Sequence, residues 1–243
     1  MRFEIYKEKQ FLSSYLIKDI IDISMKTKKN IFFWILYDFA NSILSITFFL
    51  YFAQWIVIEK GVSDFYFNLT FTISAILLLL TAPLAGLLLD KFFRRIRGLQ
   101  IITILTAIFY GLCAWSAISD KEIGALIFFT LGVYSYLLSF TFYTPLINDI
   151  VEEKRRGLIS GMGITANYLG QFTGLIIALP FSTGKINFFD AAARAETLLP
   201  SVVIFFILSL QMLVFFHEPE KNGGKIFFKK ELKNLFMETK GLF

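Results

Sequence analysis

Residues 66–89 read YFNLTFTISAILLLLTAPLAGLLL, an apolar run of 24 positions without one charged side chain. A helix needs about 20 predominantly apolar residues to cross the hydrocarbon core of a bilayer. A membrane-spanning strand would instead alternate apolar and polar positions, and this run does not. The stretch therefore predicts a transmembrane α-helix.

Five other stretches of the chain meet the same length and composition criteria. The predicted spans are 31–58, 66–89, 100–118, 123–147, 158–180 and 198–216. They leave an N-terminal segment, 1–30, and a C-terminal segment, 217–243. The first of these has no short apolar core with a small-residue cleavage site, so it is not a cleavable signal peptide. We expect an all-α membrane protein with one six-helix transmembrane bundle, 31–216.

The composition excludes the common soluble classes. Hydrophobic residues make up 56% of the chain and charged residues 18%, whereas soluble domains have about 45–50% and about 25%. The single cysteine, Cys113, cannot form an internal disulfide, and one histidine, His217, is too few for a histidine-rich zinc site. We therefore expect neither a metal site nor a cofactor.

Lysine and arginine predict the orientation in the membrane. Of the 24 such residues, 20 lie in the N-terminal segment, the 2–3 loop, the 4–5 loop and the C-terminal segment, and only 4 lie in the other three loops. Cytoplasmic loops carry an excess of Lys and Arg. Both termini should face the cytoplasm, in a multi-pass protein of a bacterial inner (plasma) membrane. Topology alone explains the positive charge, so no nucleic-acid partner is expected.

One charged residue lies within the predicted spans. Asp38 is in the first span, where a carboxylate costs about 2.5–3.5 kcal/mol on insertion scales. Asn41, Ser42 and Ser45 follow at i+3, i+4 and i+7, which places four polar groups on one helical face. We expect this face to line a path for a solute or a proton. The alternative is that Asp38 braces helix contacts near the cytoplasmic end.

The fifth span carries a second distinctive face, formed by Gly163, Asn167, Gly170, Gln171 and Gly174. Small residues let helices approach closely, and amide side chains can hydrogen-bond across a helix contact. This face predicts a helix packing contact, or a path lined by Asn167 and Gln171.

The run Tyr37-Asp38-Phe39-Ala40-Asn41-Ser42 resembles the first-helix signature of the vacuole-effluxer-like branch of the major facilitator superfamily. Residues 86–95, GLLLDKFFRR, resemble the 2–3 loop motif of that superfamily, G-x-x-x-D-(R/K)-x-G-(R/K)-(R/K), with Phe93 in place of a glycine. The resemblance implies that this loop gates helix contacts on the cytoplasmic side. Anchoring by positive charge alone is the alternative.

A third match, residues 143–157, resembles the end of helix 4 and the start of helix 5 in the same family, and its charges can pair with the 2–3 loop. The expected cytoplasmic gating residues are Gly86, Asp90, Lys91, Arg94, Arg95, Asp149, Glu153 and Arg156. His217-Glu218-Pro219 resembles the family's exit into the central loop.

The resemblance implies the N-terminal half of a fold with twelve spans. A helix at 225–243, with Phe228, Leu232, Leu235 and Phe236 on one face, would then lie on the inner membrane surface. A partner C-terminal half would come from the same gene or from a separate chain. Whether the chain is a fragment, one product of a split gene or a decayed gene stays open.

The implied function is secondary-active transport of a small polar solute by alternating access. The resemblance suggests amino acids as the solute. Asp38, as the one charged residue within the predicted spans, is expected to bind a proton or a cationic group. The alternative is a non-transporting membrane assembly partner, or an inert remnant of a split or truncated transporter. An enzyme is not expected, because the spans hold one carboxylate and no histidine for acid–base or nucleophilic chemistry.

Overall fold

The computed structural model describes residues 25–91 and 94–218, with side chains for 27–86 and 94–218. Six helices of the described residues are long and apolar enough to cross a membrane. They are Thr27–Glu59, Asp64–Gly86, Arg95–Ile118, Glu122–Ile150, Glu153–Ser182 and Ala193–Phe215. The predicted all-α architecture with six spans is confirmed. Residues 1–24 of the N-terminal segment and the helix expected at 225–243 lie outside the described residues.

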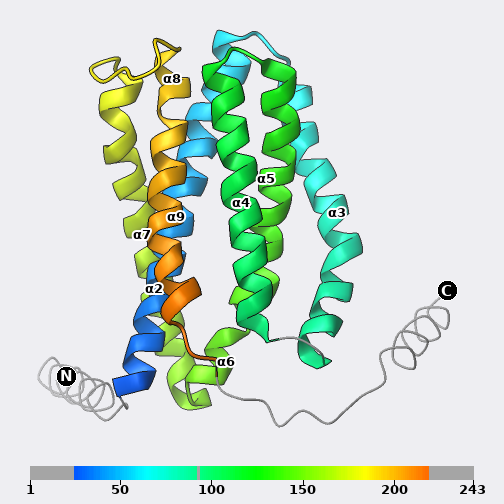
Figure 1. The fold of residues 1–243 in the computed structure, drawn as a ribbon, viewed down its shortest axis with the longest axis vertical. Helices are drawn as coiled ribbons and strands as arrows, with labels where there is room; N and C mark the ends of the chain where they lie inside the picture. The colour runs from blue at the N-terminus through cyan, green and yellow to red at the C-terminus, as the bar shows by residue number, and fades with distance from the viewer. Residues whose placement is uncertain (1–24, 92–93, 219–243) are drawn as a thin grey trace, which may run out of the picture.

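The long helices stand side by side in one bundle (Figure 1). They are α2 (Met25–Thr47), α3 (Asp64–Lys91), α4 (Arg95–Ile118), α5 (Glu122–Tyr143), α7 (Glu153–Ser182) and α9 (Leu198–Phe215). Two short helices, α6 (Leu146–Ile150) and α8 (Ala193–Glu196), precede α7 and α9. The helix α7 begins before the predicted residue 158, because its first turn is polar and extends beyond the apolar stretch.

The second half of the first span is not a regular α-helix. It continues as two π-helical segments, η1 (Phe48–Phe52) and η2 (Gln54–Glu59). Such wide turns are rare and often mark functional regions. Hydropathy carries no signal for them, so the sequence predicted only a continuous helix here.

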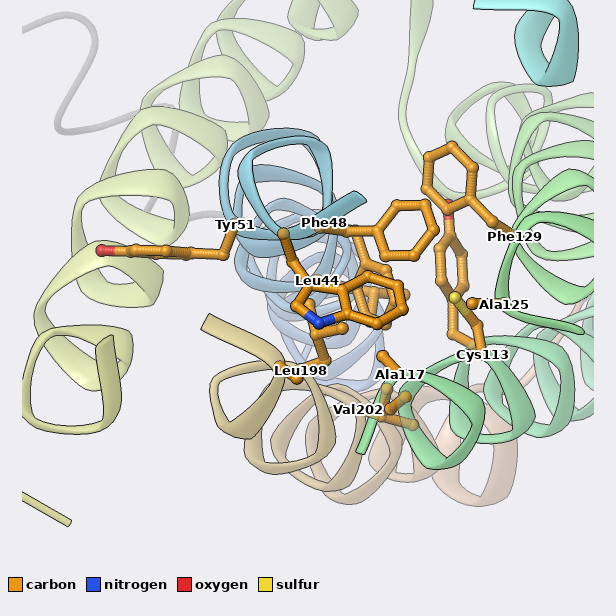
Figure 2. Packing of buried hydrophobic residues seen from close by; sticks show 14 of the residues in the cluster. Leu44, Phe48, Tyr51, Cys113, Ala117, Ala125, Phe129, Leu198 and Val202 are labelled. Atoms are coloured by element: carbon orange, nitrogen blue, oxygen red, sulfur yellow. The ribbon is translucent and has the colours of Figure 1, made fainter. Parts of the chain in front are cut away.

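The helix α2 is central and α3 is peripheral. The helix α2 packs against α7 and α9, α4 packs against α5 and α9, and α3 packs mainly against α5. Figure 1 accordingly has α3 at one edge of the bundle and α7 at the other. The largest core cluster joins η1, α4, α5 and α9, and Figure 2 shows Phe48 and Phe129 converging in it beside Cys113.

The helix α2 begins, and α9 ends, at the same end of the bundle (Figure 1). The side-chain amide of Asn30 ties these two points together. Its Nδ2 donates to the carbonyl oxygen of His217 at 2.8 Å, and its Oδ1 accepts from the backbone N–H of His217 at 3.1 Å. We call this the basal end of the bundle and the opposite end the apical end.

Candidate functional site

Asp38 lies half-buried on α2, where it faces α7. Its carboxyl interacts with the side-chain amide of Asn167, and the Oδ1 of Asn167 accepts a hydrogen bond from Nε2 of Gln171 at 2.8 Å. These three side chains, Asp38, Asn167 and Gln171, form a polar row along the α2–α7 contact. Among the described residues no Lys or Arg forms an ion pair with Asp38.

On the apical side of the polar row is a pocket of about 450 Å³, the apical pocket. Its aromatic lining comes from α2's π-helical continuation, α3, α4 and α5. These side chains are Phe48, Phe49, Phe71, Tyr110, Phe129 and Tyr136. Ser45 and Gln171 also line the pocket, and the Tyr136 hydroxyl interacts with the Ser45 side chain. None of the described residues that line it is charged.

On the basal side of the row is a second pocket of about 430 Å³, the basal pocket, which Asp38 itself lines. The Trp34 indole stacks on the Tyr143 ring with centroids 4.8 Å apart, and the Tyr143 hydroxyl donates to the carbonyl oxygen of Trp34 at 3.0 Å. Ser160 and Arg156 of α7 also line it. The first, fourth and fifth spans therefore contribute to both pockets, and the polar row lies between them.

The polar row is near the middle of the membrane-spanning length. The first span covers Thr27–Glu59, and Asp38 lies 11 residues from its basal end, about 16 Å at 1.5 Å per residue. Solute and ion sites of many transporters are found near the bilayer midplane. Asn167 lies at the middle of the fifth span, Glu153–Ser182, and Asp38 lies about a third of the way along the first span, so the polar row reaches that depth.

Helical spacing predicted that the four polar residues of α2 share one surface. In the structure they do not all line a pocket. Asp38 and Ser45 each line a pocket. Asn41 and Ser42 are fully buried and are not among the residues that line either pocket. The Ser42 hydroxyl donates to the backbone oxygen of Asp38 at 2.9 Å. The roles of Asn41 and Ser42 in a path stay predictions.

The amide of Asn41 lies beside the Tyr37 hydroxyl but, among the described residues, neither of its polar atoms has a partner in hydrogen-bond geometry. The Tyr37 hydroxyl instead pairs with Oγ1 of Thr103 at 2.8 Å. Asn41 thus lies next to the buried hydroxyl pair that joins α2 to α4.

The glycines of α7 form the predicted packing contact. A Cβ at Gly163 would lie 2.8 Å from the Trp34 ring, and one at Gly170 would overlap the carbonyl oxygen of Phe39 on α2. Gly174 similarly faces the α2 backbone at Ile43. The close approach of these helices brings Asn167, on the same face of α7, to Asp38. The packing and path-lining interpretations of this face are therefore compatible.

At the basal end, two of the expected gating residues pair across the bundle. Nη1 of Arg95, in the first turn of α4, donates to Oδ2 of Asp149 in α6 at 2.8 Å. Nε of Arg156 donates to the carbonyl oxygen of Val151 at 3.1 Å. The expected pairing between the 2–3 loop and the 4–5 loop is present. Whether it gates a path stays a prediction.

The other expected gating residues are dispersed. Gly86 lies within α3 with open space where a Cβ would be. Asp90 and Lys91 end α3, and their side chains lie outside the described part of the chain. Glu153 is an exposed residue at the start of α7.

Glu218 is the basal residue whose contacts sequence reasoning missed. Its side chain is 1% exposed, and its two carboxylate oxygens accept the backbone N–H groups of Arg95 at 3.0 Å and Ile96 at 2.9 Å. It therefore caps α4 from a point 122 residues later in the chain. Local sequence gives no signal for such a distant cap. Arg94 also donates to the backbone oxygen of Glu218.

The chain is similar to an uncharacterized MFS-type transporter, YxiO, of Bacillus subtilis (strain 168). The two are 28% identical over 160 residues, which cover 60% of this chain and 36% of the relative. Among solved structures, the fold is similar to a bacterial homologue of the human lysosomal transporter Spinster, in an inward-facing and unoccupied conformation. The TM-score is 0.59 at 14% identity, over 86% of this chain and 46% of that one.

The chain thus spans between about a third and a half of the length of these two proteins. At 14% identity, the structural likeness speaks for the fold alone. The sequence profile of the Major Facilitator Superfamily matches residues 17–175, which is more than half of the 243 residues. The chain is an integral multi-pass membrane protein and belongs to the major facilitator superfamily.

Proposed function

We propose that the chain is the N-terminal six-helix half of a secondary-active transporter. The observation that carries this proposal is the polar row between two pockets, near the middle of the membrane-spanning length. A charged group at that depth is costly unless it faces a bundle interior or a water-filled cavity. A row with a pocket on either side suits a site that is reached in turn from the two faces of the membrane.

The proposed mechanism is alternating access. This half and a second six-helix half rock about the polar row, which opens first one pocket and then the other. Both the family relative and the structural neighbour are longer than the chain, which supports a second half. We propose that the basal end faces the cytoplasm of a bacterial cell, because the Lys- and Arg-rich segments flank that end.

The proposed solute is small and polar at one end, and a proton binds at Asp38 when the solute does not. Amino acids are the first compounds to test, on the resemblance of residues 37–42 to the vacuole-effluxer-like branch. Asp38 suits this role because its only described side-chain partner is a neutral amide, Asn167. A carboxyl so placed can exchange a proton for a cationic group.

The test is transport by the protein expressed from its native gene, so that whatever completes the chain is present. Membrane vesicles are given a proton gradient and radiolabelled amino acids. Asp38→Asn should abolish gradient-driven movement at unchanged expression, whereas Asp64→Asn, an exposed carboxyl at the start of α3, should not. Transport by Asp38→Asn at the wild-type rate would remove the coupling role from Asp38.

Accessibility separates a transporter from an inert bundle. Single cysteines at Ser45, in the apical pocket, and Ser160, in the basal pocket, are labelled with a membrane-impermeant thiol reagent in a background without Cys113. A transporter should expose the two positions to opposite sides, with rates that change in opposite directions when solute is added. State-independent labelling of both would favour a non-transporting role.

A further inference from the structure

We propose that the transported solute is an amphipathic cation, with its cationic group at Asp38 and an apolar, ring-bearing body in the apical pocket. This inference rests on the proposed function and narrows its solute class. Among the described residues that line it, the apical pocket has six aromatic side chains and no charged one, and it meets the polar row at Gln171, whereas the basal pocket, which Asp38 lines, has three aromatic side chains and also the charged Arg156.

The lining of the apical pocket selects the body of the solute. Six aromatic rings line it, and a volume of about 450 Å³ suits a small organic molecule. A solute that is polar throughout would lose its hydration there and find few hydrogen-bonding groups, chiefly Ser45 and Gln171, to replace it. An aromatic or aliphatic ring would instead bury its surface against rings such as Phe71, which meets Phe129 edge to face at 5.5 Å.

The polar groups of the apical pocket gather at the end toward Asp38. Gln171 lines the pocket and is bonded to Asn167, which in turn contacts Asp38. Ser45 lies seven residues after Asp38 on the same helix, about 10 Å along its axis. A solute whose ring lies within about 10 Å of its cationic group could contact the Asp38 carboxylate and the aromatic rings of the apical pocket at the same time.

The charge distribution selects a cation. Asp38 forms no ion pair with any Lys or Arg that the structure describes. Arg156 lines the basal pocket, but its guanidinium donates to the backbone oxygens of Val151 and Asn148. The carboxylate is therefore available to a cation from the solute, and an anion would meet it unfavourably.

A lipid acyl chain is the competing occupant of the apical pocket. It would fill the aromatic lining equally well, but its binding would not depend on Asp38. The two occupants are thus distinguished by whether binding of an apolar group in the apical pocket is strengthened by a cationic group at Asp38.

The test is equilibrium binding to the purified protein in lipid nanodiscs, with three probes. Benzyltrimethylammonium carries both features, tetramethylammonium carries only the charge, and benzyl alcohol carries only the ring. Benzyltrimethylammonium should bind about tenfold or more tightly than either of the others, as burial of one ring implies. Equal affinity for the two ammonium probes would overturn the assignment of the apical pocket.

Matched variants assign the two halves of the probe. Phe71→Ala, and Phe49→Ala on the rim, should abolish the higher affinity of benzyltrimethylammonium over tetramethylammonium. Phe65→Ala, on an exposed face of α3, should leave that difference in affinity unchanged. Asp38→Asn should weaken both ammonium probes and leave benzyl alcohol unchanged, with Asp64→Asn as its control. Benzyl alcohol binding that competes with lipid and ignores Asp38 would instead identify a lipid site.

The result is independent of whether the protein transports. If binding depends on the ring but no gradient-driven uptake is found, the proposed transport function is contradicted and the binding site is supported. If fully polar solutes are taken up and the benzyl probe is not preferred, the transport function is supported and the proposal of an amphipathic cationic solute is contradicted.

Discussion

The first and second spans, neighbours in the chain, differ most in how they are packed. In the first span, 50% of the most apolar stretch is buried within the bundle, against 11% in α3. The second span is nevertheless the more apolar of the two, and the first carries the charged residue, Asp38. Hydropathy therefore reports which segments enter the membrane, and not which segments form the core of the protein.

The reason is that lipid tails are as apolar as leucine, so apolar surface gains little by leaving lipid for a helix contact. The helix α2 is held in the bundle by close backbone contact with α7 and by hydrogen bonds from polar side chains. The glycines of α7 let its backbone reach α2, and Asn30 binds the backbone of His217. The helix α3 has fewer such contacts, among them the Ser74 hydroxyl on the backbone of α5 and the Thr81–Tyr134 hydroxyl pair.

The largest expected effect comes from breaking the α2–α7 contact at Gly170. A Cβ there would overlap the carbonyl oxygen of Phe39 and lie 2.9 Å from Cβ of Ser42. Gly170→Val should cost at least about 3 kcal/mol, at the upper end of overpacking costs. The chain's one cysteine, Cys113, is buried, so labelling by a thiol-reactive dye on heating reports unfolding.

The matched control for this change is Gly161→Val, on the same helix, with open space where its Cβ would be. It should leave the unfolding temperature within a degree or two of wild type, on the order of a surface substitution. Equal losses in both variants would mean that helix propensity, and not close approach, sets the stability of α7.

A smaller loss is expected at the basal end, where Glu218 caps α4. Glu218→Gln replaces one acceptor oxygen with an NH₂ group that faces backbone N–H donors, which should cost about 1–3 kcal/mol. The readout is again the unfolding temperature from Cys113 labelling. Glu152→Gln, at an exposed side chain before α7, is the control, and an equal loss there would contradict a specific cap.

The positions of the spans could be predicted because each is a long apolar run, and the bilayer thickness fixes the length that such a run needs. The α7 glycine face was predictable for a similar reason, since helical periodicity places Gly163, Gly170 and Gly174 together. The pairing of Arg95 with Asp149 followed from charge and the family resemblance. The spans and the glycine face are local patterns, and the pairing rests on the resemblance of two motifs to one family.

The rest depended on tertiary contacts that one sequence does not encode locally. Helical spacing put Asn41 on the same face as Asp38, but neighbouring helices bury Asn41 fully, whereas Asp38 is half-buried and lines the basal pocket. The aromatic lining of the apical pocket draws on residues from four separate spans. Phenylalanine is so frequent in this chain that no spacing distinguishes Phe71 or Phe129 from the lipid-facing rings.

A modest loss is expected from weakening the hold on α3. The Ser74 hydroxyl, fully buried, lies 2.8 Å from the backbone oxygen of Thr130 on α5. Ser74→Ala should cost about 0.6 kcal/mol, the average for hydrogen bonds between membrane helices. Thr72→Ala, whose hydroxyl bonds only within its own helix, should cost less. A loss above that for Glu218→Gln would contradict the weaker hold on α3.

The smallest effect is expected on the exposed face of α3, at Leu79, which is 74% exposed. In the chain alone, Leu79→Ala should change stability by less than about 0.5 kcal/mol, because the side chain meets lipid tails both when folded and when the helices separate. Ser74→Ala on the same helix should exceed it. The comparison of the two spans becomes sharper if the measurement is repeated with a second six-helix half present. A destabilisation that appears only then would mean that the low burial of α3 marks a surface for that half, whereas an unchanged value would assign this position to lipid.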